Sequence, residues 1–281
     1  MAVIESKRQT TLKVWLWIGL TFGALFAGFP ALWMLLSSVK PNTEIFAYPP
    51  TFLPEKFTLD AYIEILTDAG KVRFFVNSYG VALAVVLLTL FAGIMAGYAL
   101  SRFDFPLKRS LNAIVISIQA VPPITLLIPY FALVVWLRLY DNLWALILTY
   151  MVATIPYAIL MMTGYFNTIP KELDEAVKVD GGGHMRALWR VLVPVARPGI
   201  VAVGAYTFMV AWNEFLFALT LTQSRENRTV PVGIQLLMGE HSFKWNEMLA
   251  MSVLGCIPVL ILFLLFQRQF VSGMTAGAVK S

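Results

Sequence analysis

The chain offers few side chains that could carry chemistry inside its apolar segments, and the most unusual of them is Glu214. It is the one acidic residue well inside a long apolar run, where a carboxylate is costly and therefore points to a functional role. Together with Trp212 and Asn213 it offers the hydrogen-bond acceptors and flat aromatic surface that suit a sugar. These three residues could line a substrate path, and a hydrogen bond between helices that holds the outer gate would explain Glu214 equally well. Plain packing is the other interpretation.

Motifs for catalysis are missing from the sequence. It has no H-E-x-x-H segment, no GxxxxGK[ST] phosphate loop and no second acid within an apolar run to pair with Glu214. The histidines His184 and His241 fall in different loops, and Cys256 is the only cysteine, so a shared metal site and a disulfide framework are not expected. We therefore predict a chain that is not an enzyme and binds no metal.

The composition indicates a membrane protein. Hydrophobic residues make up 59% of the 281 residues and charged residues 13%, whereas about 25% of the residues of a soluble domain are charged. Six apolar runs are long enough to cross a membrane: 14–36, 76–100, 111–137, 143–166, 199–222 and 249–267. The predicted fold class is an all-α integral membrane protein with six transmembrane helices, the first of which we interpret as a retained helix because no small-residue cleavage site follows it.

The basic residues predict the orientation of these helices. Most of the 21 Lys and Arg residues lie inside if both termini are cytoplasmic, in agreement with the positive-inside rule. They are scattered singly and form no basic patch, so a nucleic-acid partner is not expected. The predicted parts are a cytoplasmic N-terminus (1–13), a first transmembrane helix (14–36), an extracytoplasmic loop (37–75), a core with five transmembrane helices (76–267) and a cytoplasmic C-terminal tail (268–281).

Prolines interrupt several of the predicted spans. Pro122, Pro123 and Pro129 fall in the third, Pro156 in the fourth and Pro258 in the sixth. Because lipid cannot replace the backbone hydrogen bonds that proline removes, broken helices hint at a cavity. Ordinary kinking for helix packing is the other interpretation.

The only long cytoplasmic loop, 167–198, combines an acidic amphipathic helix with consecutive glycines. Pro170 and the acids that follow it predict a helix start. On this helix we expect Leu173, Ala176 and Val177 to form the apolar face and Asp174 to pair with Lys178 on the polar face.

Gly181, Gly182 and Gly183 end this helix, and a second helix from Met185 to Val195 follows. Of the glycines, Gly181 is expected to need its conformation, while Gly182 and Gly183 should tolerate alanine.

Two surroundings could suit such a pair of helices. It could lie in the lipid interface, where its arginines would contact anionic headgroups. The acids Glu172, Asp174, Glu175 and Asp180 argue against this placement, because an anionic membrane would repel them and a groove in a partner protein could accept them.

Glu175-Ala176, Asp180-Gly181 and Leu192-Val193-Pro194 resemble, in type and spacing, the EAA signature of permease subunits in binding-protein-dependent ABC importers. The resemblance extends over essentially the whole chain and is closest to the smaller carbohydrate permease of the maltose-transporter type. Two positions differ from the signature, since Val177 stands where the family usually has a second alanine and Gly182 where it usually has another.

The resemblance implies a type I ABC importer permease with a cytoplasmic coupling helix between spans 4 and 5. It implies four kinds of partner: a second homologous permease in a heterodimer, two ABC ATPase subunits, an extracytoplasmic sugar-binding protein and the lipid of a bacterial or archaeal cytoplasmic membrane. ATP and Mg²⁺ would then bind to the ATPase subunits, and this chain would bind no cofactor. The residues that the resemblance assigns to ATPase coupling are Glu175, Ala176, Asp180, Gly181, Leu192 and Pro194.

Two functions remain in competition. A carbohydrate importer subunit accounts for the six spans and the acidic cytoplasmic loop. An ion-coupled secondary transporter with Glu214 in a broken-helix site would leave that loop unexplained. The identity of the sugar stays open, although the absence of Arg and Lys deep in the spans favours neutral sugars over phosphate-bearing ones.

Overall fold

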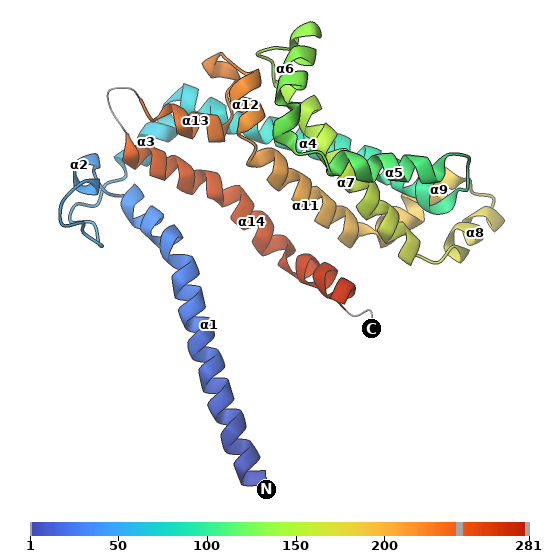
Figure 1. Ribbon diagram of the computed structural model, residues 1–281, viewed down its shortest axis with the longest axis horizontal. Coiled ribbons are helices and arrows are strands. Elements are labelled where there is room, and N and C mark those ends of the chain that lie inside the picture. The colour runs from blue at the N-terminus through green and yellow to red at the C-terminus, as the bar shows by residue number, and fades with distance from the viewer. Residues whose placement is uncertain (1, 240–243, 279–281) are drawn as a thin grey trace. The chain divides into compact units, whose positions relative to one another are not determined.

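The computed structural model describes residues 2–239 and 244–278, with side chains for 13–239 and 244–267, and the described part contains helices and no β-strand (Figure 1). The chain divides into two compact units, Met1–Thr67 with Ile234–Gly255 (unit 1) and Asp68–Gly233 with Cys256–Ser281 (unit 2).

Unit 1 begins with α1 (Ala2–Ser38), whose large apolar side chains from Val14 to Phe29 are exposed, as expected of a helix in lipid. The predicted loop that follows contains two short helices, α2 (Asn42–Ile45) and α3 (Asp60–Thr67). Glu44 holds this loop together, because its Oε1 accepts hydrogen bonds from the Thr51 hydroxyl at 2.8 Å and the Glu55 N–H at 2.9 Å. The last helix of the chain, α14 (Trp245–Ala278), begins in this unit.

Unit 2 is built on close packing of α4 (Ala69–Arg102) against α7 (Leu143–Thr168). Gly93 and Gly97 lie one turn apart on α4, where an added Cβ would come within 2.7 Å of the Ala158 Cβ and 2.8 Å of the Met162 Cβ, respectively. Small residues at this spacing let two membrane helices approach closely. The van der Waals contacts of this close packing replace the hydrophobic driving force, which is missing between helices in lipid. The helix α11 (Arg197–Trp212) packs on both.

The predicted third span, 111–137, is not a continuous helix. It consists of α5 (Lys108–Gln119), the short 3₁₀ helix η1 (Pro123–Leu126) and α6 (Leu127–Trp136), with a bend of 95° between α5 and the segment that starts at Pro123. Two adjacent prolines, Pro122 and Pro123, have no N–H to continue the helical hydrogen bonds, so the helix ends before them.

The predicted fifth span, 199–222, is also divided. It contains α11 and α12 (Leu216–Leu221), separated by a break at 213–215. The 16 residues of α11 extend about 24 Å, which is less than the ~30 Å of a membrane core. Two further elements, η3 (Arg225–Asn227) and α13 (Val230–Leu236), follow α12.

Four helices of the described residues are long and apolar enough to cross a membrane: Lys13–Ser38, Ala69–Arg102, Leu143–Thr168 and Trp245–Gln267. Two bent helix pairs would raise the number to six if each pair crosses the membrane once. The first pair is Lys108–Gln119 with Pro123–Trp136. The second pair is His184–Val195 with Arg197–Trp212, and its two helices are bent by 79°. The upper number equals the number of predicted spans, and the predicted third span coincides with the first bent pair. The second bent pair differs from the predicted fifth span, because it includes His184–Val195 from the loop 167–198 and ends before α12.

Candidate coupling site

The loop 167–198, called the coupling loop from here on after its predicted role, folds as two helical segments joined by a tight turn. The first is α8 (Glu172–Val179). The second runs through α9 (His184–Ala187), a five-residue π-helix η2 (Leu188–Leu192) and α10 (Val193–Val195), and so matches the predicted helix from Met185 to Val195 in extent. A π-helix is rare and is often found at functional sites.

The turn between the two segments depends on Gly181, as predicted. Its φ is +75°, a conformation that side chains disfavour. The Gly181 N–H donates to the Lys178 carbonyl at 3.0 Å, and the Gly182 N–H donates to the Val177 carbonyl at 2.8 Å. This is the hydrogen-bond pattern of a Schellman motif, in which a glycine ends a helix and satisfies its last carbonyls.

The prediction that Gly182 tolerates alanine is wrong. A Cβ at this position would lie 2.5 Å from the Val177 Cγ1 and 2.8 Å from the Val177 carbonyl oxygen. At Gly183, in contrast, an added Cβ meets no atom within 4 Å.

Asp174 is buried, and this overturns the predicted surface pair with Lys178. Its Oδ2 lies 2.8 Å from Nε of Arg102, and its Oδ1 accepts a hydrogen bond from the Tyr98 hydroxyl at 3.2 Å. The two charged side chains are only 6% and 8% exposed. Of the predicted apolar face, Leu173 and Ala176 are exposed and Val177 is half-buried. A buried carboxylate needs a partner, and Arg102 at the end of α4 supplies it.

Arg102 also binds the end of α7. Its guanidinium donates to the carbonyl oxygens of Phe166 and Ile169, each at 2.9 Å. The sequence alone does not indicate these partners of Arg102. Its hydrogen bonds connect α4, α7 and α8 at one point, which the planar, five-donor geometry of arginine allows.

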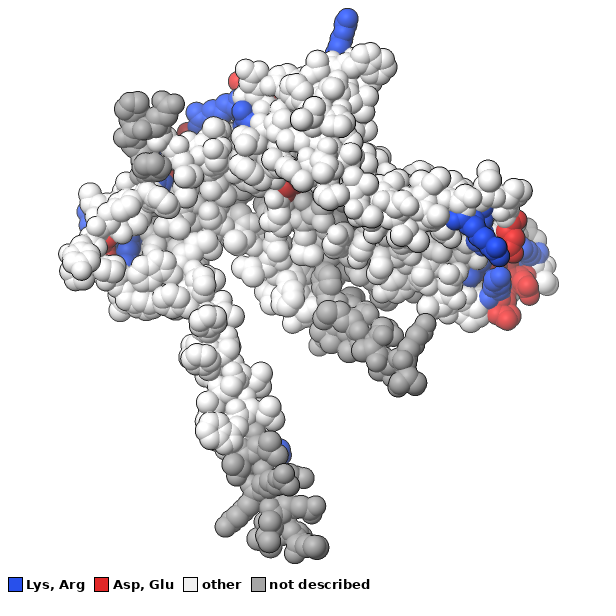
Figure 2. Space-filling model, in the orientation of Figure 1, with Lys and Arg blue, Asp and Glu red and all other residues white. Residues whose placement is uncertain are grey.

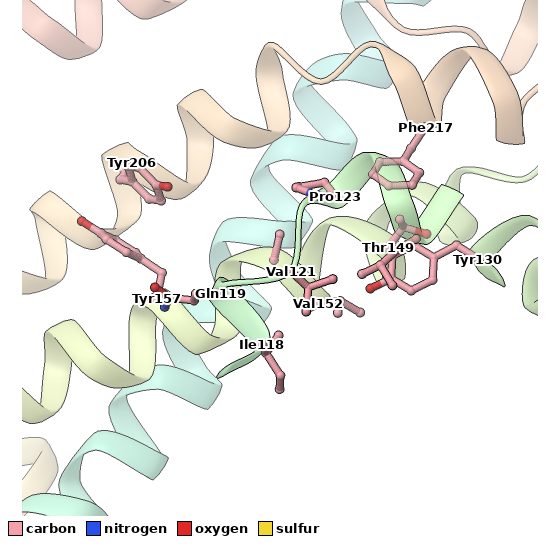
Figure 3. Close-up of a pocket in the computed structure, with 12 residues that line it drawn as sticks. Ile118, Gln119, Val121, Pro123, Tyr130, Thr149, Val152, Tyr157, Tyr206 and Phe217 are labelled. Atoms are coloured by element: carbon pink, nitrogen blue, oxygen red, sulfur yellow. The ribbon is translucent and has the colours of Figure 1, made fainter. Parts of the chain in front are cut away.

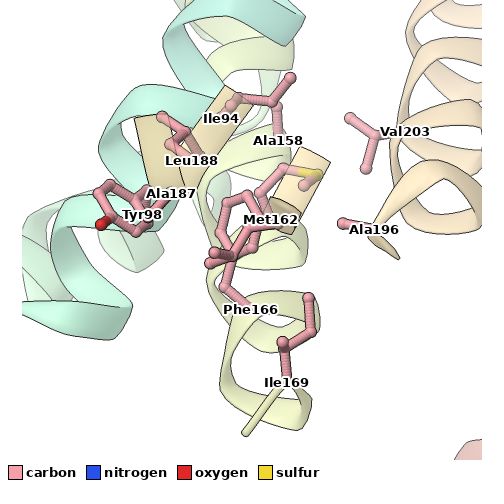
Figure 4. Close-up of a cluster of buried hydrophobic side chains, with 11 residues drawn as sticks. Ile94, Tyr98, Ala158, Met162, Phe166, Ile169, Ala187, Leu188, Ala196 and Val203 are labelled. Carbon is pink, nitrogen blue, oxygen red and sulfur yellow. The ribbon is translucent and has the colours of Figure 1, made fainter. Parts of the chain in front are cut away.

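A hydrophobic cluster lies beneath this ion pair (Figure 4). It contains Tyr98 from α4, Met162 and Phe166 from α7, and Leu188 and Leu192 from the second segment of the coupling loop. Leu192 has no exposed surface and packs the loop against α4 and α7 within this cluster. Pro194, close to it in the sequence, is half-buried.

The remaining predicted coupling residues lie at the tip of the loop. Glu175, Ala176, Asp180 and Gly181 are exposed, and Val179 is 87% exposed. Val179 was not singled out from the sequence because it lies outside the expected apolar face. Charged side chains gather over the α8 end of unit 2, whereas the surface of the adjoining helices is almost free of charge (Figure 2). The tip therefore combines acids with a large unpacked apolar side chain.

Glu214 lies at the break between α11 and α12 and is engaged in structural hydrogen bonds. Its carboxylate accepts from the N–H groups of Phe217 at 2.8 Å and Ala218 at 3.0 Å, and from the Tyr150 hydroxyl at 2.7 Å. It thus caps α12 and connects it to α7. The hydrogen bond from Tyr150 joins two helices, as the gate interpretation requires, and it fits plain packing as well.

The neighbours of Glu214 have separate surroundings. Trp212 is buried, with its ring centroid 4.7 Å from that of Tyr79 and 5.4 Å from that of Phe208. Asn213 is exposed, and its side chain donates to the Met209 carbonyl at 2.9 Å.

Among the residues that the structure describes, no group of His, Cys, Asp and Glu side chains could hold a metal ion. His184 lies on the coupling loop with its ring against the edge of Phe103 at 4.9 Å. His241 falls outside the described residues.

Known proteins agree with this architecture. The chain is 38% identical to the sulfoquinovosyl glycerol transport system permease protein of Agrobacterium fabrum, over 90% of this chain and 88% of the relative. It is 35% identical to the trehalose/maltose transport system permease protein of Thermococcus litoralis, over 97% and 99%. A bacterial ABC transporter for the import of alginate has the same fold, with a TM-score of 0.79 at 23% identity over 94% of this chain and 97% of that chain.

A family model matches as well. Residues 89–276 match the model described as binding-protein-dependent transport system inner membrane component, which supports the importer and not the ion-coupled alternative. This match covers more than half of the chain, and relatives above 30% identity cover nearly all of it. The chain therefore belongs to the family of inner membrane components of binding-protein-dependent transport systems, and it is a multi-pass membrane transport subunit with the type I ABC importer permease fold.

Proposed function

We propose that this chain is the transmembrane subunit of an ATP-driven carbohydrate importer, in which it forms half of the translocation path. The printed functions of its relatives support this proposal, since they name trehalose, maltose and arabinooligosaccharides among the transported compounds. The chain has no phosphate loop of its own. ATP and Mg²⁺ therefore bind to two partner ATPase subunits, and the coupling loop transmits their closure to the membrane helices.

The observation that carries the coupling role is the contrast between the buried and the exposed side of α8. On the buried side, Asp174 is paired with Arg102 at 2.8 Å. On the exposed side and in the turn that follows, Glu175 and Asp180 are exposed and Val179 is 87% exposed. An exposed apolar side chain among charges suits a partner groove with an apolar centre and polar rim, and the buried ion pair passes the movement of that partner to α4 and α7.

The other partners follow from the same proposal. A second homologous permease completes the path as a heterodimer, and an extracytoplasmic sugar-binding protein delivers the ligand. An alginate transporter of this fold, with a TM-score of 0.69, was solved together with a ligand-bound periplasmic protein, which supports a partner of that kind. Both termini of this chain are then cytoplasmic, so that the coupling loop faces the ATPase subunits.

Binding-protein-stimulated ATPase activity of the reconstituted complex tests the coupling role. Glu175→Lys reverses the charge at the tip, and Gly181→Val forces a side chain into a φ of +75°. Both variants should insert into the membrane but lose the stimulation, while Gly183→Ala, which meets no neighbouring atom, should retain it. Full stimulation in both variants at wild-type assembly would show instead that the loop is an anchor at the lipid interface. Failure of the wild-type chain to co-purify with an ATPase subunit would reject the importer itself.

A further inference from the structure

A cavity of about 230 Å³ lies in unit 2 beside the break in the predicted third span (Figure 3). The elements α5, η1, α6, α7, α11 and α12 contribute its walls. Four of its lining residues are aromatic: Tyr130, Tyr157, Tyr206 and Phe217. Gln119 and Thr149 add polar groups, and none of the residues that line it carries a charge.

The aromatic residues form two pairs at opposite ends of the cavity, with Val121 between them (Figure 3). The ring centroids of Tyr157 and Tyr206 are 4.0 Å apart with an angle of 31° between the ring planes. Those of Tyr130 and Phe217 are 5.6 Å apart. Tyrosine joins an apolar ring face to a hydroxyl that donates and accepts hydrogen bonds, a combination that suits a ligand with apolar C–H faces and many hydroxyl groups.

The break in the helix lies at Gln119, which lines the cavity. Gln119 is the last residue of α5, and the residue that would donate to its carbonyl in a continuous helix is Pro123, which has no N–H. Irregular backbone at membrane depth is found where it lines a cavity or is buried in protein. The side-chain amide of Gln119 adds hydrogen-bonding capacity beside the Tyr157 ring (Figure 3).

We propose that this cavity is a subsite for one uncharged sugar ring on the translocation path, an inference that rests on the proposed importer function. The uncharged lining selects the class of ligand, because a carboxylate or phosphate would call for Arg or Lys. A volume near 230 Å³ is below the ~300–1,000 Å³ of complete small-molecule sites. The cavity thus holds one ring, and the rest of the ligand extends toward the partner permease. None of the residues predicted for the path, Trp212, Asn213 and Glu214, lines it.

The test uses the complex of this chain with its partner permease, ATPase subunits and binding protein. Trehalose, maltose and arabinose serve as neutral probes and glucuronic acid as an anionic probe, first in stimulation of ATPase activity and then in uptake. We expect a response to a neutral probe. For that probe, Tyr206→Ala and Gln119→Leu should each raise the apparent KM for uptake about tenfold, the effect of one lost ring contact or hydrogen bond, with ATPase stimulation at saturating ligand unchanged.

Matched controls separate binding from folding. Tyr140→Ala removes a tyrosine of similar exposure outside the cavity and should leave the KM unchanged, while Tyr206→Phe keeps the ring and should have a smaller effect than Tyr206→Ala. An unchanged KM in both cavity variants, or a response to glucuronic acid alone, would overturn the proposal. Loss of the partner permease from the Tyr206→Ala complex would also overturn it, since the cavity would then be a packing surface. A wild-type complex that responds to no probe would count against the proposed importer function, and the subsite would fall with it.

Discussion

Nε of Arg102 lies 2.8 Å from Oδ2 of Asp174, in an ion pair that joins the last residue of α4 to the first turn of α8. The pair is separated by 72 residues in the sequence and is nearly inaccessible to solvent. Burying two charges offsets much of their attraction, so such a pair is weak evidence of net stability. Its effect is on position, because Arg102 can satisfy Asp174 and the carbonyls of α7 only in one arrangement of the three helices.

Asp174→Ala should destabilise the protein strongly, because it leaves the Arg102 charge buried without its carboxylate. Loss of one partner of a buried pair costs about 3–5 kcal/mol. Arg102→Lys should also lower the stability, since one ammonium group cannot reach all the acceptors of a guanidinium. The midpoint of thermal unfolding in detergent measures both effects. Asp104→Ala is the control, because it removes an exposed ion pair with Lys108 and should cause no measurable change. Equal midpoints for Asp174→Ala and the control would refute the structural role of the pair.

Glu214 should act as a helix cap and not as an ion-coupling site. Glu214→Gln keeps one carbonyl oxygen for the N–H groups at the start of α12 and an amide that can donate to the Tyr150 oxygen, so uptake should continue. Glu214→Ala removes the cap at a cost of about 1 kcal/mol and leaves the Tyr150 hydroxyl without its acceptor. Uptake measured with a protonophore, at maintained ATP, should be unaffected in the wild type and in Glu214→Gln. Uptake that collapses with the protonophore in both the wild type and Glu214→Gln would favour an ion-coupled mechanism.

Asp141 predicts a pH dependence of stability. Burial raises the pKa of its carboxyl group, but hydrogen bonds from the N–H groups of Gln223 at 2.8 Å and Ser224 at 3.0 Å outweigh burial and hold the pKa below the ordinary 3.8. A lowered pKa means that the charged form stabilises the fold. This contribution is complete above pH 3.8 and is lost as the pH falls through the lowered pKa.

Asp141→Asn isolates this charge. Asparagine retains the oxygen that accepts both hydrogen bonds and tolerates the φ of +57° at this position. At pH 7 the variant should therefore unfold at a lower temperature than the wild type, and the gap should narrow as the pH is lowered below 3.8. A gap that is constant from pH 7 down to the acid limit of the fold would mean that the carboxyl group does not titrate as described.

The sequence predicts four of the six spans as continuous helices and the two helical segments of the loop 167–198, because lipid requires long apolar helices and because an amphipathic, glycine-ended helix has a local signature. It does not predict contacts between distant elements. Nothing near Arg102 in the sequence indicates Asp174 as its partner, for example. The break in the third span follows from adjacent prolines, whereas the break at 213–215 has no proline, and only the hydrogen bonds of Glu214 to the start of α12 explain it. Asp174 looked like a surface acid because its burial is determined by α4 and not by its own helix.

The two departures from the EAA signature, Val177 and Gly182, are in contact. The Val177 side chain occupies space that a Cβ at residue 182 would need, at 2.5 Å from its Cγ1. The larger side chain at residue 177 and the absent side chain at residue 182 therefore compensate each other in volume. In a family member with alanine at both positions, the two methyl groups would share the space that the Val177 side chain fills here.

This compensation predicts a non-additive pair of substitutions. Gly182→Ala alone should destabilise the coupling loop by about 1–3 kcal/mol, the usual cost of overpacking. Val177→Ala removes the methyl groups in the way, so the double variant should recover part of the loss, with a coupling energy of about 0.5–3 kcal/mol. Recovery is incomplete because the Val177 carbonyl oxygen would still lie 2.8 Å from the new Cβ until the turn relaxes. Thermal unfolding of the wild type, the two single variants and the double variant measures this coupling energy, and their binding-protein-stimulated ATPase activity shows its effect on function. Gly183→Ala is the control at an open position. Strictly additive effects of the two substitutions would show that the side chains do not share this space.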